Sequence, residues 1–323
     1  MTDFDAFRPE LFSPDLIDDE TLELNRSIEE QMTLAPARWE MTEEYERTLT
    51  PGGGLIPTSG PVPGLEERVI PGAGGSVPVR IIPCDERPQG VYLHFHGGGF
   101  AMGAARHHDR MLAETAREAR VAVVSVDYRL APESPYPAAP ADAEAAAMWV
   151  LQHGDEELGS NRLVIGGESA GATLSLLAAL RLRDRHDFTG LAGLNLSQGA
   201  YDMRMTPGMR AWGRRRLIIN TPTIKRHYDR YLRDADREDP DVSPLFADLT
   251  GMPPALFTVG TADPLLEDSA FMYVRWITSG RQGTLDIYPG GCHAFNYFPT
   301  ELGRKAAGRV NDFIRARCSD TSA

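Results

Sequence analysis

The ten residues VIGGESAGAT, positions 164–173, carry the strongest structural signal in this chain of 323 residues. The apolar run RLVIGG, which ends at Gly167, is typical of a buried strand, and the following ATLSLLAALRL is typical of a helix. Between them, Ser169 is the centre of a G-x-S-x-G pattern. A serine in such a sharp turn needs small residues two positions away on each side, as Gly167 and Gly171 are. The stretch therefore predicts a strand, a tight turn that presents the Ser169 hydroxyl, and a helix.

Short apolar runs recur along the chain, mostly separated by segments with helical periodicity such as ADAEAAAMWVLQ. The first two runs are joined by the turn-rich PGAGGS and resemble a hairpin. Strands that alternate with helices are typical of a parallel sheet covered on both faces. We therefore predict an α/β fold with an eight-stranded, mostly parallel sheet flanked by helices. The predicted strands are 67–70, 77–82, 91–95, 121–128, 162–167, 191–197, 255–260 and 284–289.

Two segments interrupt this alternation, and we predict that together they form a helical cap. The N-terminal segment covers residues 1–45 and the insert covers 200–240, which divides the core into 46–199 and 241–323. The first 32 residues contain ten acidic and two basic side chains, whereas 204–233 contain nine basic and one acidic. Opposite charge favours docking of the two segments over the site. Two separately solvated helix faces are the alternative.

The composition disfavours several classes of partner. The net charge is -13 and the pI about 5.1, whereas nucleic acid and anionic membranes attract basic surfaces. The first residues have neither a basic start nor an apolar run, so we expect no signal peptide and no membrane span. The three cysteines match no disulfide framework or CxxC pattern. We expect a cytoplasmic protein that acts on a small molecule.

The setting of Ser169 is typical of a catalytic nucleophile. The helix predicted after Ser169 directs its N-terminal N–H groups toward any negative charge that develops at the serine. The stretch HGGGF (96–100), directly after an apolar run, offers further backbone N–H groups. We predict that the N–H groups of Gly98, Gly99 and Ala170 form an oxyanion hole.

A serine nucleophile also needs a base and an acid at the same edge of the sheet, in the chain order serine, acid, histidine. Asp263 follows the apolar ALFTVG, and His293 follows TLDIYP and two glycines. We predict that His293 is the base and Asp263 the acid that orients it. Glu267 and Asp268 are rivals for the acid, but both follow Pro264 and belong to the next predicted helix.

Several motifs in order resemble the hormone-sensitive-lipase-like family of α/β-hydrolases, which includes many bacterial carboxylesterases. They are HGGGF (96–100), VDYRLAPE (126–133), YPAAPADA (136–143), GESAG (167–171), SPLFADLTGMPPALFTVGTADPLLED (243–268) and YPGGCHAFN (288–296). The resemblance covers roughly residues 60–317. It implies an α/β-hydrolase core with a helical cap, hydrolysis of short- to medium-chain acyl esters, and no cofactor.

By position, the resemblance implies Ser169 as nucleophile, His293 as base, Asp263 as acid and the same three oxyanion-hole N–H groups. It also implies a structural role for His96. The chain departs from the family pattern where Glu267 replaces the second acid and where HAF replaces HGF after the last turn. The cap segments match no family pattern, so the resemblance leaves the substrate open.

The histidines suggest a rival site. His94 and His96 form an H-x-H pattern of the kind found in zinc sites, with His107 and His108 nearby in the chain. Three glycines stand where such sites place further ligands, so we expect no metal.

Two other functions would use the same residues. An amidase or formamidase would use the same triad, and a non-hydrolytic receptor would use the same pocket. Cys292 adjoins His293, but we predict a loop or core residue there because Ser169 already holds the nucleophile position. We favour a serine carboxylesterase with a small-molecule ester as substrate, and a homodimer is among the assemblies we consider.

Overall fold

The computed structural model describes residues 7–42, 44–45 and 61–319, which form an α/β fold around one eight-stranded sheet. Residues 1–6 and 46–60, which include the predicted boundary between the N-terminal segment and the core, lie outside the described residues. The strands are β1 (Glu66–Gly72), β2 (Gly75–Ile82), β3 (Gly90–Phe95), β4 (Val121–Val126), β5 (Leu163–Glu168), β6 (Gly193–Ser197), β7 (Ala255–Ala262) and β8 (Gly283–Cys292).

The strand order is β1-β2-β4-β3-β5-β6-β7-β8. The pairs β1–β2 and β2–β4 are antiparallel, and the remaining pairs are parallel. The predicted fold class is therefore confirmed. The first hairpin is tighter than expected, because Pro71 and Gly72 pair with Ser76 and Gly75 and extend the strands into the predicted turn. Every residue of β3, β4 and β5 is buried, as expected for central strands covered on both faces.

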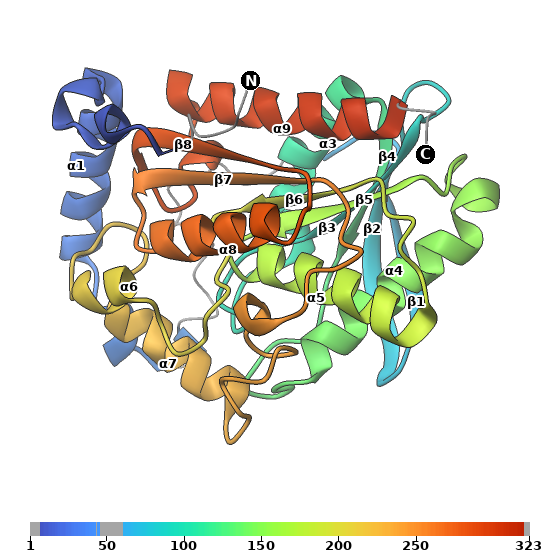
Figure 1. Ribbon diagram of the computed structural model, residues 1–323, viewed down its shortest axis with the longest axis horizontal. Coiled ribbons are helices and arrows are strands. Elements are labelled where there is room, and N and C mark those ends of the chain that lie inside the picture. Colours follow the sequence, from blue (N-terminus) through green and yellow to red (C-terminus); the bar gives the residue numbers. More distant parts are fainter. Residues whose placement is uncertain (1–6, 43, 46–60, 320–323) are drawn as a thin grey trace.

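Helices cover both faces of the sheet (Figure 1). Apolar residues of α3 (Asp109–Ala119) and α9 (Glu301–Ser319) pack together on one face, and those of α4 (Ala138–Glu157), α5 (Ala170–His186) and α8 (Leu266–Thr278) pack on the other. Short 3₁₀ turns occur at Pro9–Phe12, Pro14–Leu16, Arg38–Glu40, Ala105–His108, Pro244–Phe246 and Phe295–Tyr297. Within the described ranges, no helix has both the length and the apolar character needed to span a membrane.

The N-terminal segment and the insert lie side by side at one end of the molecule, where α1 (Asp19–Leu34) meets the region of α6 (Pro207–Ala211) and α7 (Thr221–Leu232) (Figure 1). Asp18 caps α1 by accepting a hydrogen bond from the Thr21 N–H. Asn25 donates a hydrogen bond to the Gly290 carbonyl and so fixes α1 to β8.

The two segments dock against each other, and in the described residues an ion pair accompanies hydrogen bonds from arginine to backbone carbonyls. Arg215 forms an ion pair with Glu29 at 2.6 Å. Arg216 instead donates to the carbonyl oxygens of Met32 and Ala35, at 2.7 and 2.9 Å, and its guanidinium lies over the Trp39 ring. The last carbonyl groups of an α-helix accept no hydrogen bond from within the helix. Arg216 supplies the donors for these carbonyls at the end of α1.

We predict that Arg216→Ala releases the N-terminal segment. The end of α1 loses its charged hydrogen-bond donor, and such bonds contribute about 1.5–3 kcal/mol. Chymotrypsin cleavage within residues 7–42 is then expected to be roughly tenfold faster than in the wild type. Arg210→Ala is the matched control, because Arg210 donates to Arg204 within the insert. Equal cleavage rates in the wild type and Arg216→Ala would contradict this account.

Candidate active site

Ser169 lies at the predicted turn between β5 and α5. Its backbone has φ 56° and ψ -121°, a sparsely populated conformation for a residue with a side chain. The Ser169 N–H donates to the Ser197 carbonyl oxygen of β6 at 2.9 Å, which holds the turn against the neighbouring strand. The strand, the turn and the helix are therefore where the sequence predicts them.

The two glycines that flank this turn are required by a close approach of the backbone. A Cβ on either Gly167 or Gly171 would overlap the carbonyl oxygen of Phe95, the last residue of β3. The same carbonyl thus fits between both glycines. This confirms the need for small residues two positions from Ser169 and identifies the end of β3 as the reason.

The glycine-rich loop after β3 lies beside Ser169. Gly98 has φ 129° and Gly99 has φ 60°, which are conformations that favour glycine. A side chain at Gly99 would also overlap His227 of α7, so the loop lies directly under the insert. Gly98, Gly99 and Ser169 line one cavity, and Ala170 is the first residue of α5.

His96 supports this loop from the protein interior. Its Nδ1–H donates to the Gly97 carbonyl at 2.8 Å, its ring stacks on Tyr128, and the Tyr128 hydroxyl donates to the His96 carbonyl. Burial lowers the pKa of His96 to about 4, so its imidazole is neutral near pH 7. These contacts accord with the structural role that the resemblance implies.

Asp263 and His293 are brought together at the same edge of the sheet. Asp263 follows β7 and His293 follows β8, and His293 Nδ1 donates to Asp263 Oδ2 at 2.9 Å. The other carboxylate oxygen accepts from the Leu265 N–H at 2.9 Å. With Nδ1 hydrogen-bonded to the carboxylate, Nε2 is the nitrogen left for proton transfer. Both side chains are buried, and His293 lines the cavity of Ser169.

The rival acids have other partners. Glu267 accepts a hydrogen bond from the Gly208 N–H of α6. Asp268 accepts from the N–H groups of Tyr201 and Asp202, and burial raises its pKa to about 7. Both carboxylates therefore tie α8 to the insert, as their position inside a helix suggested.

Cys292 is a core residue, as expected. It is buried among the side chains that pack under α1. Burial raises the pKa of its thiol to about 12, so the thiolate that a nucleophile requires is scarce at neutral pH.

The cavity next to Ser169 has a volume of about 70 Å³ and is lined by three parts of the chain. The core contributes Gly97, Gly98, Gly99, Met102, His108, Glu168, Ser169, Gln198, His293, Ala294 and Tyr297. The insert contributes Ile218, Ile219, Thr223, Ile224 and His227, and the N-terminal segment contributes Arg38. The two docked segments thus supply the part of the cavity wall that the core does not.

Gln198 is a site residue that the sequence analysis missed. It follows β6, and its side-chain oxygen accepts from the Ala294 N–H at 2.6 Å while its amide donates to Asn296 at 3.1 Å. Gln198 therefore anchors the loop that carries His293. The signal was available, because the residue after a parallel strand lies at the same edge as the other site residues.

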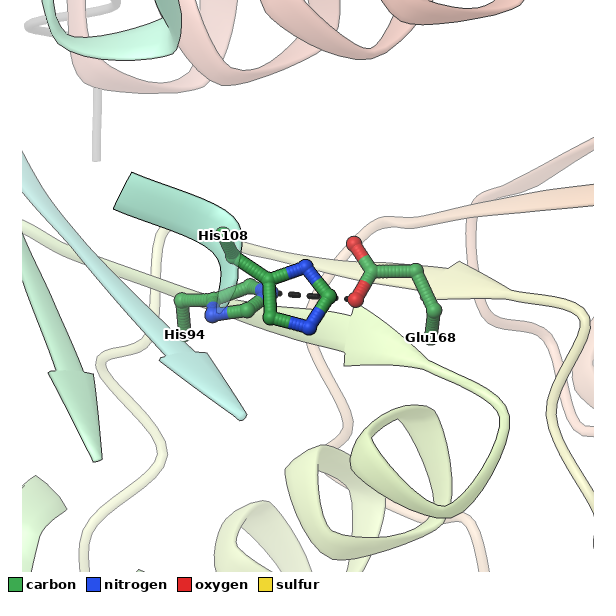
Figure 2. A group of neighbouring side chains, drawn as sticks. All are labelled: His94, His108 and Glu168. Atoms are coloured by element: carbon green, nitrogen blue, oxygen red, sulfur yellow. Dashed lines mark hydrogen bonds and ion pairs between the residues drawn. The ribbon is translucent and has the colours of Figure 1, made fainter. Parts of the chain in front are cut away.

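Two of the four histidines considered for a metal, His94 and His108, gather with Glu168 beneath the nucleophile turn (Figure 2). Their ligand atoms lie within 4.8 Å of one another, and all three residues are buried. However, His94 already bonds Glu168 through Nε2 at 3.0 Å and Ser125 through Nδ1 at 3.1 Å. A metal ion would have to break these bonds, so we interpret the group as a buried polar contact between β3 and β5.

Comparison with known proteins places this geometry among hydrolases. A family model described as alpha/beta hydrolase fold matches residues 92–297. The chain is 34% identical over 262 residues to a carboxylic ester hydrolase, LipN, of Mycobacterium tuberculosis, covering 76% of this chain and 68% of that protein. It is 32% identical over 233 residues to an acetyl esterase of Salmonella choleraesuis, covering 71% and 72%. Among solved structures, a hormone-sensitive lipase from a metagenome library superposes with a TM-score of 0.80 at 25% identity, covering 94% of this chain and 99% of that one.

We predict that the buried neutral histidines make stability fall below about pH 6.5. Burial lowers the pKa of both His96 and His108. The unfolded chain then binds protons that the folded chain does not, which costs about 1.4 kcal/mol per histidine for each pH unit below 6.5. The melting temperature should drop less between pH 7 and pH 5 in His108→Phe than in the wild type. His186→Gln, at an exposed site, is the control and should keep the wild-type drop.

Proposed function

Since this chain belongs to the hormone-sensitive-lipase-like family of α/β-hydrolases and is a carboxylic ester hydrolase, we propose that it cleaves short acyl esters through an acyl-enzyme on Ser169. One observation carries the proposal: His293, which is hydrogen-bonded to Asp263, borders the same cavity as the strained turn of Ser169. These three residues supply the acid, base and nucleophile that acyl transfer requires.

In the first half-reaction, His293 Nε2 takes the hydroxyl proton as Ser169 Oγ attacks the ester carbonyl carbon. The N–H groups of Gly98, Gly99 and Ala170 stabilise the resulting oxyanion. Asp263 holds the imidazole in the tautomer that accepts this proton and stabilises the imidazolium that forms. The tetrahedral intermediate then collapses, the bond to the leaving alcohol breaks, and His293 returns the proton to that alcohol.

In the second half-reaction, water replaces the alcohol. His293 takes a proton from water, the hydroxide attacks the acyl carbon, and the second oxyanion occupies the same hole. Collapse breaks the bond to Ser169 Oγ, which regains its proton from His293 and releases the carboxylic acid. In both half-reactions, His293 accepts the proton and returns it.

The size and lining of the cavity support a short acyl chain. Its volume of about 70 Å³ is far below the 300–1,000 Å³ that is usual for drug-sized ligands. Isoleucine side chains of the insert form much of its outer wall, which suits a short apolar group. The names of the relatives do not favour the amidase or receptor alternatives. Three further statements stay predictions: that the protein needs no cofactor, that it is cytoplasmic, and that it forms a homodimer.

The proposed nucleophile and chain length can be tested together. We expect the wild type to hydrolyse p-nitrophenyl acetate and butyrate fastest within a series from acetate to palmitate, and an anilide only weakly. Ser169→Ala should have no activity above background on any of them. Activity that survives in Ser169→Ala would refute the nucleophile, and an anilide cleaved as fast as the esters would favour the amidase.

The proposed acid has its own test. Asp263→Asn should keep the fold but lower kcat by roughly 10⁴, because the amide favours the wrong histidine tautomer. Glu267→Gln is the matched control at the rival acid and should stay within a few-fold of the wild type. Near-normal turnover in Asp263→Asn, together with a collapse in Glu267→Gln, would move the acid to Glu267.

A further inference from the structure

Residues 213–221 form a closed loop between α6 and α7, which we call the insert loop. Its ends are joined by two hydrogen bonds: the Gly213 N–H donates to Thr221 Oγ1 at 2.9 Å, and the Thr221 N–H donates to the Gly213 carbonyl at 3.0 Å. The loop carries three consecutive arginines, Arg214 to Arg216, followed by the apolar Leu217–Ile218–Ile219. It therefore joins the docking surface for the N-terminal segment to the wall of the cavity.

Ile218 lies at a strained point of the insert loop. The Ile219 N–H donates to the Leu217 carbonyl at 2.8 Å, so the chain reverses over a single residue, and Ile218 has φ 64°. A three-residue turn with positive φ is rare and strained, and a β-branched residue is a marked outlier there. Glycine would adopt this backbone without the strain.

The strained turn brings the side chain of Ile218 to the cavity wall. Ile218 is buried and lines the cavity that contains Ser169 and His293. Leu217 and Ile218 both belong to the apolar cluster under α1 that includes Ile28, but Leu217 is not among the residues that line the cavity. Both side chains thus anchor the loop, and Ile218 in addition faces the reacting groups.

Contacts from outside hold the loop in this conformation. The Ile218 N–H points to the sulfur of Met32 at 3.2 Å, and the adjacent Arg216 binds the Met32 carbonyl at 2.7 Å. Arg215 pairs with Glu29 on the same helix. A strained residue keeps its conformation where several surrounding contacts fix it, and such residues concentrate at functional sites.

We propose that Ile218 is a specificity-determining residue. The strained turn fixes its side chain as a wall of the cavity and thereby limits the length of the carbon chain that an ester can carry beneath the insert. This inference rests on the proposed short-chain esterase function. A glycine at this position would remove the strain and the wall together.

The test compares Ile218→Gly and Ile218→Ala with the wild type. Two substrate series are used: p-nitrophenyl esters of increasing acyl length, and acetates of alcohols of increasing length. Both are needed because either the acyl group or the alcohol group of the ester can contact Ile218. In one of the two series, both variants should raise the ratio of kcat/KM for octyl over the two-carbon chain by about tenfold, the size expected for relieving a methylene-scale clash. A change within twofold in both series would overturn the proposal.

Stability supplies a second readout of the strain. Alanine is normally the more stabilising of the two residues, but at φ 64° glycine has the advantage. Ile218→Gly should therefore melt no lower than Ile218→Ala, and the opposite order would overturn the strained turn. Arg120 is the matched control, with φ 56° at the exposed end of α3. Arg120→Gly should melt above Arg120→Ala, and neither should change the chain-length ratio.

The two proposals fail in different ways. A wild type that prefers long chains would refute the short-chain function. If the wild type prefers short chains but the Ile218 variants accept no longer ones, only the proposed role of Ile218 is refuted. If the wild type hydrolyses none of these esters, the chain-length limit can be measured by ligand binding instead. Straight-chain carboxylates from acetate to octanoate are then added, and the longest one that raises the melting temperature gives the limit. Ile218→Gly must then extend the longest stabilising chain, and an unchanged limit would overturn the wall.

Discussion

The carbonyl oxygen of Phe95 lies so close to the nucleophile turn that neither Gly167 nor Gly171 could carry a side chain. This backbone approach joins the end of β3 to the β5–α5 connection, in which Ser169 has its positive-φ conformation. Because β3 and β5 are parallel neighbours, both end at the same edge. The glycine-rich loop that continues from β3 therefore emerges beside Ser169, and the relative position of nucleophile and loop follows from one steric constraint.

Buried polar side chains stabilise this edge of the sheet through hydrogen bonds. His96 is neutral and hydrogen-bonded within its own loop, and His94 bridges Ser125 and Glu168 across three neighbouring strands. Gln198 performs the same task for the loop of His293. Each of these three side chains makes at least one hydrogen bond, because a buried polar side chain without any partner is costly. The reacting side chains are thus held by neighbours that take no part in the chemistry.

The outer half of the cavity has a different physical basis. It depends on two segments far apart in the sequence, and the contacts between them are chiefly arginine to backbone carbonyl. Arg216 and Arg226 satisfy carbonyls in the stretch from Met32 to Met41, so the insert and the N-terminal segment depend on each other. Charge complementarity, which is visible in the sequence, accounts for the Arg215–Glu29 pair.

The sequence by itself determined the fold class, the order of the strands along the chain and the places of Ser169, Asp263 and His293 after strands. These features are local, since they follow from apolar periodicity and from glycines next to a serine. The place of Gln198 after a strand indicates its edge of the sheet, but only the tertiary structure decided that it bonds the His293 loop and that Ile218 faces the cavity. Those positions arise from hydrogen bonds and packing between segments distant in the chain, which leave no periodic pattern in the sequence. Local chemistry thus specifies the reacting groups, whereas long-range packing specifies the space around them.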